Sequence, residues 1–182
     1  TILETERCIV RELELSDLDD FFPCMQNRND RLYGGTIWIW GRAGISESLY
    51  RKYVSFLRIW NVARFWEKTG TLIGRAGVEH REELNGDMEL GYAIRTSFQH
   101  QGYAYEVCQA IMQYAGEELQ VHLLHCLIQK ENTLSEKLAI KLGFSYCGDR
   151  EIDGVLMSDY QIEWWWKPDA KFKRWFLIEN KI

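Results

Sequence analysis

The chain has 182 residues, of which 46% are hydrophobic and 27% charged, and it carries a net charge of −5. This composition is typical of one globular domain, and no apolar run approaches the ~20 residues that cross a bilayer, so no membrane partner is expected. A negative net charge argues against nucleic-acid binding and suits a cationic substrate. The five cysteines show no regular spacing, so we expect neither disulfides nor a metal site.

The first third of the chain is predicted to form one strand and two helices. Its opening residues lack the basic-then-apolar layout of a signal peptide, so we expect a cytoplasmic protein. Residues 7–13 have the pattern of a strand, and Ser16 can cap a helix whose apolar residues recur at helical spacing. A second helix is expected from Ser46. The two helices are expected to form part of a substrate wall.

From residue 59 the apolar pattern changes to a period of two, which predicts three antiparallel strands. The strands are expected at residues 59–67, 71–80 and 88–94. Asn85 and Gly86 are typical of the tight turn between the second and the third. In the third strand, alternation places Glu89 on the same face as Gly91 and Ala93. Glu89 is therefore expected to lie among small side chains.

The third strand leads into a helix through Gln99-His100-Gln101-Gly102-Tyr103-Ala104. Gly102 and the small Ala104 let the backbone come close to a ligand. The first N–H groups of the helix lack partners within it, and the helix dipole favours phosphate. The segment therefore predicts a pyrophosphate site. Neither G-x-x-x-x-G-K-[ST] nor a G-x-G-x-x-G after a strand occurs, so a Walker or dinucleotide site is not indicated.

A strand, a helix and two further strands are predicted to complete the fold. They are expected at residues 121–129, 132–143, 144–147 and 156–166. We divide the chain into one domain, residues 1–167, and a basic-aromatic tail, residues 168–182. The three consecutive tryptophans at 164–166 are more typical of a core or a subunit interface than of a ligand cage, so a homodimer is possible.

The order of these elements, with Gln99-x-x-Gly102-x-Ala104 between a strand and a helix, resembles the GNAT N-acetyltransferase superfamily. The opening residues 3–7, the Glu89-Leu90-Gly91-Tyr92 strand, and the run from Asn132-Thr133-Leu134-Ser135 to Lys141-Leu142-Gly143-Phe144 resemble its ribosomal-protein N-terminal (alanine) acetyltransferase branch. The resemblance implies an α/β (α+β) fold with a mixed, mostly antiparallel central sheet of about seven strands and about four flanking helices. It also implies acetyl-coenzyme A as co-substrate, bound where the strands near 88–95 and 121–129 splay apart.

The same resemblance implies which residues contact this cofactor. They are Ile94 at the pantetheine, Gln99, Gln101, Gly102, Tyr103 and Ala104 around the pyrophosphate, and Asn132 and Ser135 near the thioester. Gln99 has a second interpretation, as a residue that only fixes the loop. Ser135 and Asn132 also have a second interpretation, as hydrogen-bonding residues at the start of a helix, because Asn132 and the Thr133-x-x-Glu136 spacing resemble capping groups.

An amine that attacks a thioester needs a base, because a group with a pKa of ~10.4 is neutral only about one time in two thousand at pH 7. Glu89 is the first candidate, since partial burial would raise its pKa, although a solvated cross-strand partner is the alternative. Glu151, expected on the turn before the last strand, is the rival by analogy with the family. Ser135 is the candidate to assist the departing thiolate, because the tyrosine of many GNAT enzymes is Ala139 here.

The sequence therefore predicts an N-acetyltransferase that moves an acetyl group from acetyl-coenzyme A to a primary amine by direct attack. The acceptor is expected to be a protein N-terminus or a small-molecule amine. Two other interpretations stay open. One is a non-catalytic coenzyme A-binding or regulatory module, which Ala139 favours. The other is an interaction domain assembled through the tryptophan-rich last strand.

Overall fold

The computed structural model describes residues 3–11, 62–67, 70–152 and 154–164. The helices predicted from Ser16 and Ser46 lie outside the described residues, and so does the predicted tail at 168–182. The division of the chain at residue 167 therefore stays a prediction.

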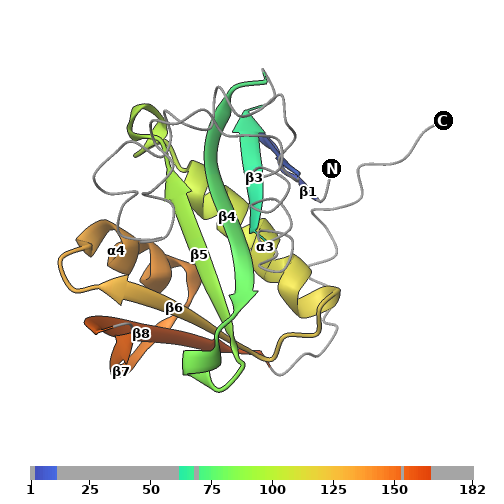
Figure 1. Cartoon of the computed structure of the whole chain (residues 1–182). Coiled ribbons are helices and arrows are strands. Elements are labelled where there is room, and N and C mark those ends of the chain that lie inside the picture. Colours follow the sequence, from blue (N-terminus) through green and yellow to red (C-terminus); the bar gives the residue numbers. More distant parts are fainter. Residues whose placement is uncertain (1–2, 12–61, 68–69, 153, 165–182) are drawn as a thin grey trace, which may run out of the picture.

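Eight strands of the described residues form one sheet in the order β1-β2-β3-β4-β5-β6-β8-β7 (Figure 1). They are β1 (Leu3–Glu4), β2 (Cys8–Arg11), β3 (Val62–Glu67), β4 (Leu72–His80), β5 (Met88–Ile94), β6 (Leu123–Gln129), β7 (Ser145–Ile152) and β8 (Val155–Glu163). Every neighbouring pair is antiparallel except β5 and β6, which are parallel. The predicted mixed, mostly antiparallel sheet is therefore confirmed.

Two α-helices follow β5 and β6, and each has local signals for its ends. Helix α3 (Tyr103–Glu117) begins after Gly102, whose φ of +85° is a left-handed conformation that glycine adopts without strain. Helix α4 (Thr133–Leu142) is capped by Asn132, whose side chain accepts a 3.2 Å hydrogen bond from the Ser135 amide. It ends at Gly143, with φ +97°. Short 3-10 turns, η4 (Glu82–Leu84) and η5 (Thr96–Phe98), flank β5.

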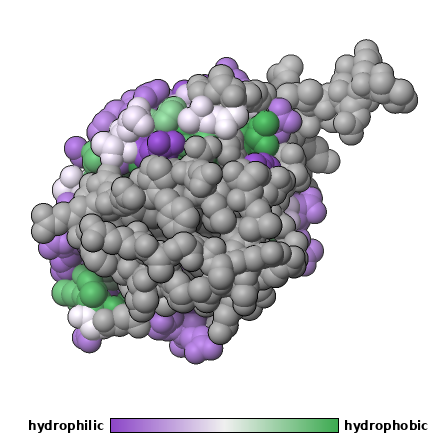
Figure 2. Space-filling model, turned by 45° about the horizontal axis from the view of Figure 1, so that its top comes forward, coloured by the Kyte–Doolittle hydropathy of each residue, from purple (hydrophilic) through white to green (hydrophobic). Residues whose placement is uncertain are grey.

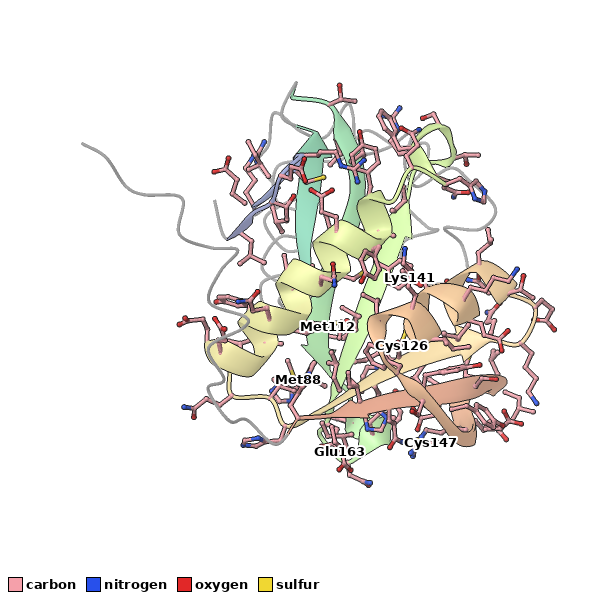
Figure 3. All side chains as sticks on the ribbon, turned by 180° about the vertical axis from the view of Figure 1, so that it is seen from behind. Met88, Met112, Cys126, Lys141, Cys147 and Glu163 are labelled. Carbon is pink, nitrogen blue, oxygen red and sulfur yellow. The ribbon has the colours of Figure 1, made fainter. Side chains whose placement is uncertain are left out.

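The main core lies between the sheet and the two helices. Figure 3 shows α3 and α4 on one side of the sheet and labels three members of this core, Met88, Met112 and Cys126. The apolar face of α3 is buried there, with Val107, Cys108, Ile111 and Ala115 all at most 4% exposed. Trp164 packs against the same core. The described residues contain three buried free cysteines and one exposed, Cys147, and no cluster that could hold a metal.

The last hairpin differs from the prediction in length. β7 continues to Ile152, well beyond the predicted end at Cys147, so Glu151 lies within a strand and not on the turn before β8. β7 is an edge strand of the sheet and is mostly exposed. An exposed edge strand needs no apolar alternation, so the polar residues from Gly148 to Glu151 gave no strand signal.

The described surface is mixed in character. In the view of Figure 2 its apolar residues form small separate groups among hydrophilic ones. The large apolar side chains that are exposed are Leu119, Leu134, Ile140, Tyr146, Val155 and Leu156. Within the described ranges, no helix is long and apolar enough to cross a membrane.

An ion pair ties the N-terminal hairpin to the first turn of α3. The carboxylate of Glu106 accepts hydrogen bonds from the Thr5 hydroxyl (2.6 Å), the Arg7 amide (2.8 Å) and the Arg7 Nε (2.7 Å). Arg7 also donates to the Gln101 carbonyl (2.9 Å) and lies over the Tyr103 ring, 4.3 Å from its centre. Burial alone would raise the pKa of Glu106, but these hydrogen bonds outweigh it and hold that pKa below its usual value.

Glu106→Gln should therefore lower the stability of the fold in a pH-dependent way. A carboxyl group with a depressed pKa stabilises the folded state above its unfolded pKa and loses that contribution as the pH falls through the folded pKa. Loss of the charge-assisted hydrogen bonds should cost about 1.5–3 kcal/mol, or a Tm decrease of roughly 3–12 °C, at pH 7. Thermal unfolding should show the difference shrinking towards zero below about pH 4.

Glu118→Gln is the matched control for this measurement, because Glu118 is exposed at the other end of the same helix. A Tm difference for Glu106→Gln that is the same at pH 7 and pH 4 would contradict the assigned role of the charge.

Candidate active site

The strands β5 and β6 pair with each other over only a short part of their length. β5 pairs with β4 along all seven of its residues, and β6 pairs with β8 along all seven of its own. Between β5 and β6 the register contains only Met88 with Leu124 and Glu89 with His125. Beyond these pairs the strands diverge, as Figure 1 shows. This divergence agrees with the splay that the family resemblance implies, and we call the Glu89–His125 pair its vertex.

The loop that enters α3 lies at the open end of this divergence. His100 and Gly102 both have left-handed backbones, with φ of +60° and +85°. No side chain caps α3, and its first helical hydrogen bond is donated by the Glu106 amide to the Gly102 carbonyl. The amides of Tyr103 and Ala104 therefore precede the first helical bond, and the helix dipole points its positive end at this loop. This geometry is that of an anion-binding site. We call Gly102 and the backbone amides of Tyr103 and Ala104 the anion seat.

The two glutamines of the loop hydrogen-bond to its own backbone. Gln99 Nε2 donates to the Ile94 carbonyl (3.1 Å), and Gln101 Nε2 donates to the Ser97 carbonyl (3.0 Å). These bonds favour the loop-fixing interpretation of Gln99. The ring of Tyr103 is buried and meets Phe98 edge-on, with the ring centres 6.1 Å apart. Any contact of Tyr103 with a bound anion would therefore come from its backbone amide.

The second helix starts on the β6 side of the divergence. Asn132 follows β6 and caps α4, so its side-chain oxygen is already bonded to the Ser135 amide. The capping interpretation of Asn132 is therefore correct. Any contact of Asn132 with a cofactor would occur in addition to this capping bond. The buried Tyr160 hydroxyl donates to Glu136 (2.9 Å) in the same first turn, and burial and this bond raise the pKa of Tyr160 to about 12. Ala139, further along α4, is fully buried.

Glu89 lies at the vertex and is only 4% exposed. Its Oε2 is 3.0 Å from Arg81 Nε, and its carboxyl group hydrogen-bonds to that of Glu79, the opposite residue on β4. Burial is the largest influence and raises the pKa of Glu89 to about 8; Arg81 lowers it and Glu79 raises it further. Burial also raises the pKa of Glu79, to about 7. Gly91 and Ala93 follow on the same face, as predicted.

Glu151, the rival base, lies elsewhere. It is exposed on β7, and β8 and β6 separate that strand from β5. The structure therefore brings Glu89 to the divergence of the strands and does not bring Glu151 beside it.

Sequence reasoning missed two residues at the vertex, His125 and Asp159. Together with Glu89 they are the buried charged or polar residues of the described chain, at 2%, 3% and 4% exposed, and they lie on the adjacent strands β6, β8 and β5. The position of His125 within the apolar run Leu123-Leu124-His125-Cys126-Leu127-Ile128 was the available signal, because a buried histidine needs a partner. Asp159 gave no comparable signal.

The arrangement combines an anion seat at the open end of two diverging strands with a buried carboxyl group at their closed end. Five residues of β5, or about 17 Å, separate the vertex from Ile94. A carboxyl group with a pKa near neutrality can accept a proton from a weakly acidic group such as an ammonium. The geometry therefore fits an elongated, phosphate-bearing ligand whose reactive end reaches a base.

Comparison with known proteins identifies the family. Residues 7–145 match the family described as an acetyltransferase (GNAT) domain. The uncharacterized N-acetyltransferase YoaA of Bacillus subtilis (strain 168) is 25% identical over 150 residues, which cover 79% of this chain and 82% of that protein.

Two solved structures share the fold. The ribosomal L7/L12 alpha-N-protein acetyltransferase RimL in complex with coenzyme A has a TM-score of 0.66 at 17% identity, covering 89% of this chain and 97% of that one. Spermidine N-acetyltransferase from Vibrio cholerae in complex with CoA and spermine has a TM-score of 0.66 at 21% identity, covering 86% and 95%.

The family match covers most of the chain and includes the anion seat, the vertex and the start of α4. The predicted superfamily and the predicted enzyme class are confirmed. The chain belongs to the GNAT family of acetyltransferases.

Proposed function

We propose that this acetyltransferase transfers the acetyl group of acetyl-coenzyme A to a primary amine by direct attack, with Glu89 as the base. The observation that carries the proposal is the position of Glu89. It is the buried carboxyl group at the point where β5 and β6 part, opposite the anion seat at their open end. A cofactor anchored by its diphosphate at Gly102 would extend between the strands and bring its thioester towards this carboxyl group.

In this proposal the backbone amides from Gln101 to Ala104 bind the pyrophosphate, and the β5 backbone towards Ile94 runs beside the pantetheine arm. Gln99 supports the loop through its bond to the Ile94 carbonyl. The start of α4, with Asn132 and Ser135, lies across the divergence. There the positive end of the α4 dipole would stabilise the departing thiolate, with Ser135 available as a hydrogen-bond donor.

Glu89 has a pKa suited to the chemistry. An alkyl ammonium with a pKa of ~10.4 requires roughly 4–5 kcal/mol for deprotonation at pH 7, whereas an α-amino group at ~8 requires only about 1 kcal/mol. A base with a pKa of about 8 matches that of the α-amino group, and it also assists deprotonation of the alkyl ammonium. The direct mechanism then needs no covalent enzyme intermediate, since the amine attacks the thioester carbon and the C–S bond breaks.

The acceptor class remains a choice between two kinds of amine. The two solved structures compared above act, by their descriptions, on a ribosomal protein and on spermidine. The charge of −5 and the acidic residues around the vertex favour a cationic acceptor of either kind. We propose a protein N-terminus or a small-molecule amine, acetylated in the cytoplasm. A panel of N-terminal peptides, polyamines, amino acids and aminoglycosides, with thiol release as the readout, would separate them.

A non-catalytic coenzyme A-binding module is the second candidate, because Ala139 stands where many relatives carry a tyrosine. Ala139 is fully buried and can supply no proton to a thiolate. A thiolate with a pKa near 8.5 leaves with modest help, so the absence of this tyrosine does not prevent transfer. Coenzyme A binding without thiol release across the whole panel would favour the module.

Glu89→Gln should reduce kcat/KM for the amine by about 10²- to 10⁴-fold with little change in coenzyme A affinity, because the amide cannot accept the proton. In the unmodified enzyme kcat/KM should fall as the pH drops below about 8, since protonation of Glu89 removes the base. Steady-state rates between about pH 6 and pH 9 would measure both effects.

Ionisation of the amine also affects the pH dependence of kcat/KM, and changing the acceptor separates this effect from that of Glu89. The part of the pH–rate profile that reports ionisation of the substrate should shift when an α-amino acceptor (pKa ~8) is replaced by an alkyl amine (pKa ~10.4). The part that reports ionisation of Glu89 should stay at the same pH. Glu151→Gln is the matched comparison. Full turnover in Glu89→Gln with loss of turnover in Glu151→Gln would assign the base to Glu151.

Gly102→Ala should weaken coenzyme A binding by about tenfold or more. A left-handed backbone at φ +85° costs a residue with a Cβ roughly 1–2 kcal/mol, and the new Cβ would lie 3.4 Å from Arg7 Nη2. Relief of this strain would displace the amides of the anion seat. Gly86→Ala is the control, because Gly86 has φ +88° with open space around it in a turn distant from the loop. Calorimetric titration with coenzyme A should show the loss only for Gly102→Ala, and equal affinities would contradict the assigned seat.

A further inference from the structure

We propose that Arg7, in the turn between β1 and β2, holds the Gly102 amide in the orientation that binds the diphosphate of the cofactor. The inference rests on the proposed function, in which coenzyme A binds at the anion seat. It gives Arg7 a role beyond its ion pair with Glu106. Arg7 is a positioning residue for a loop that lies 94 positions further along the chain.

The Arg7 guanidinium lies against the start of α3 and contacts three residues there. Its Nε donates to Glu106 (2.7 Å), and its Nη1 donates to the Gln101 carbonyl (2.9 Å). Its central carbon lies over the Tyr103 ring, 4.3 Å from the ring centre. Glu106 keeps its negative charge at neutral pH, because its pKa lies below the usual value. The guanidinium is therefore held in place although 40% of the side chain is exposed.

The bond to Gln101 determines the direction of the next amide. In a trans peptide the carbonyl oxygen and the following N–H lie on opposite sides of the C–N bond. Because the Gln101 oxygen points towards Arg7, the Gly102 N–H points away from it. This N–H belongs to an exposed residue and has no hydrogen-bond acceptor among the described residues. It can therefore join the Tyr103 and Ala104 amides in binding an anion.

Glycine at position 102 makes this restraint necessary. A flip of the peptide between Gln101 and Gly102 exchanges the directions of its carbonyl and its N–H, and it changes the sign of φ at Gly102. Glycine adopts both signs of φ about equally well, so the observed φ of +85° does not by itself prevent the flip. After a flip the Gln101 oxygen would face the diphosphate and repel it. The bond from Arg7 to this oxygen opposes the flip.

The two glutamine side chains of the loop do not restrain this peptide. Gln99 donates to the Ile94 carbonyl and Gln101 donates to the Ser97 carbonyl, so both bonds anchor backbone that precedes the peptide. Among the described residues, Arg7 supplies the side-chain bond to the peptide itself. Loss of this bond should therefore leave the loop folded and the Gly102 amide free to turn.

Arg7→Gln tests the proposal by calorimetric titration. The variant should bind coenzyme A about tenfold more weakly or worse, because the charge-assisted bond that orients the amide is lost. Dephospho-coenzyme A retains the diphosphate, so its affinity should fall by the same factor. Arg7→Lys should lose a similar amount, since a lysine ammonium lacks the planar fork that reaches Glu106 and Gln101 together.

Two results of these titrations would overturn the inference. Full affinity in Arg7→Lys would assign the effect to positive charge alone. A loss for coenzyme A without a loss for dephospho-coenzyme A would place the effect of Arg7 at the 3′-phosphate.

Thr5→Ala is the matched control. It removes hydrogen bonds to Glu106 and to the Cys8 amide from the same turn, and it leaves the bond between Arg7 and Gln101 in place. Its Tm should fall while its affinity for coenzyme A stays that of the unmodified protein, and an equal loss of affinity would contradict the role of Arg7. Full affinity in Arg7→Gln with a loss in Gly102→Ala would refute this inference alone, whereas full affinity in both would also refute the anion seat.

Two further measurements report the orientation of the amide and not the stability of the turn. In 15N-labelled protein the Gly102 amide proton should shift downfield on saturation with coenzyme A, and it should shift less in Arg7→Gln. With S-acetylpantetheine, a thioester without phosphate, kcat/KM should be the same in both proteins, whereas with acetyl-coenzyme A it should fall about tenfold or more in the variant. Equal amide shifts, or an equal fall with both thioesters, would overturn the inference.

Discussion

The early end of the pairing between β5 and β6 determines the rest of the site. A parallel pair normally continues along both strands, because each added residue satisfies further backbone groups. Here the pairing stops at Glu89 and His125, while each strand stays fully paired on its other side, with β4 and with β8. The sheet therefore remains a rigid support on both sides of the opening. Both helices that follow these strands start at its wide end, so two positive helix ends face one space.

Burial of a carboxyl group at the vertex has an energetic cost. Glu89 has a folded pKa of about 8 against a usual value of 4.5. A group whose acid form is favoured by folding contributes less and less stability as the pH rises between these two values, because the unfolded chain ionises first. At neutral pH burial of the Glu89 carboxyl group therefore lowers the stability of the folded state, on the order of a few kcal/mol for a fully buried acid. Arg81 offsets part of this cost, and the pairing of Glu89 with Glu79 increases it.

Local signals in the sequence predicted the helices and strands around the site well, but they did not predict the long-range contacts between side chains. The strand at 88–94, the start of α3 after Gly102 and the end of α4 at Gly143 depend on residues close in sequence, and all three were predicted. The burial of Glu89 was anticipated from its small neighbours on β5. Its contacts with Arg81 and Glu79 depend on the register of β4, which alternation alone does not specify. The hydrogen bond between His125 and Asp159 joins residues that are 34 apart in sequence and lie on two strands, so no local sequence pattern predicts it.

The bond between Arg7 and Glu106 has a consequence for the order in which the protein forms during synthesis. The two residues are 99 positions apart, so Arg7 leaves the ribosome long before its partner exists. Until Glu106 emerges, the first hairpin lacks the ion pair and the ring of Tyr103 on which the guanidinium rests. Such distant contacts form slowly, because a long loop must close before they add stability. Docking of the first turn of α3 on the opening strands must therefore wait until Glu106 has emerged, and the proposed phosphate-binding loop takes its final form late in synthesis.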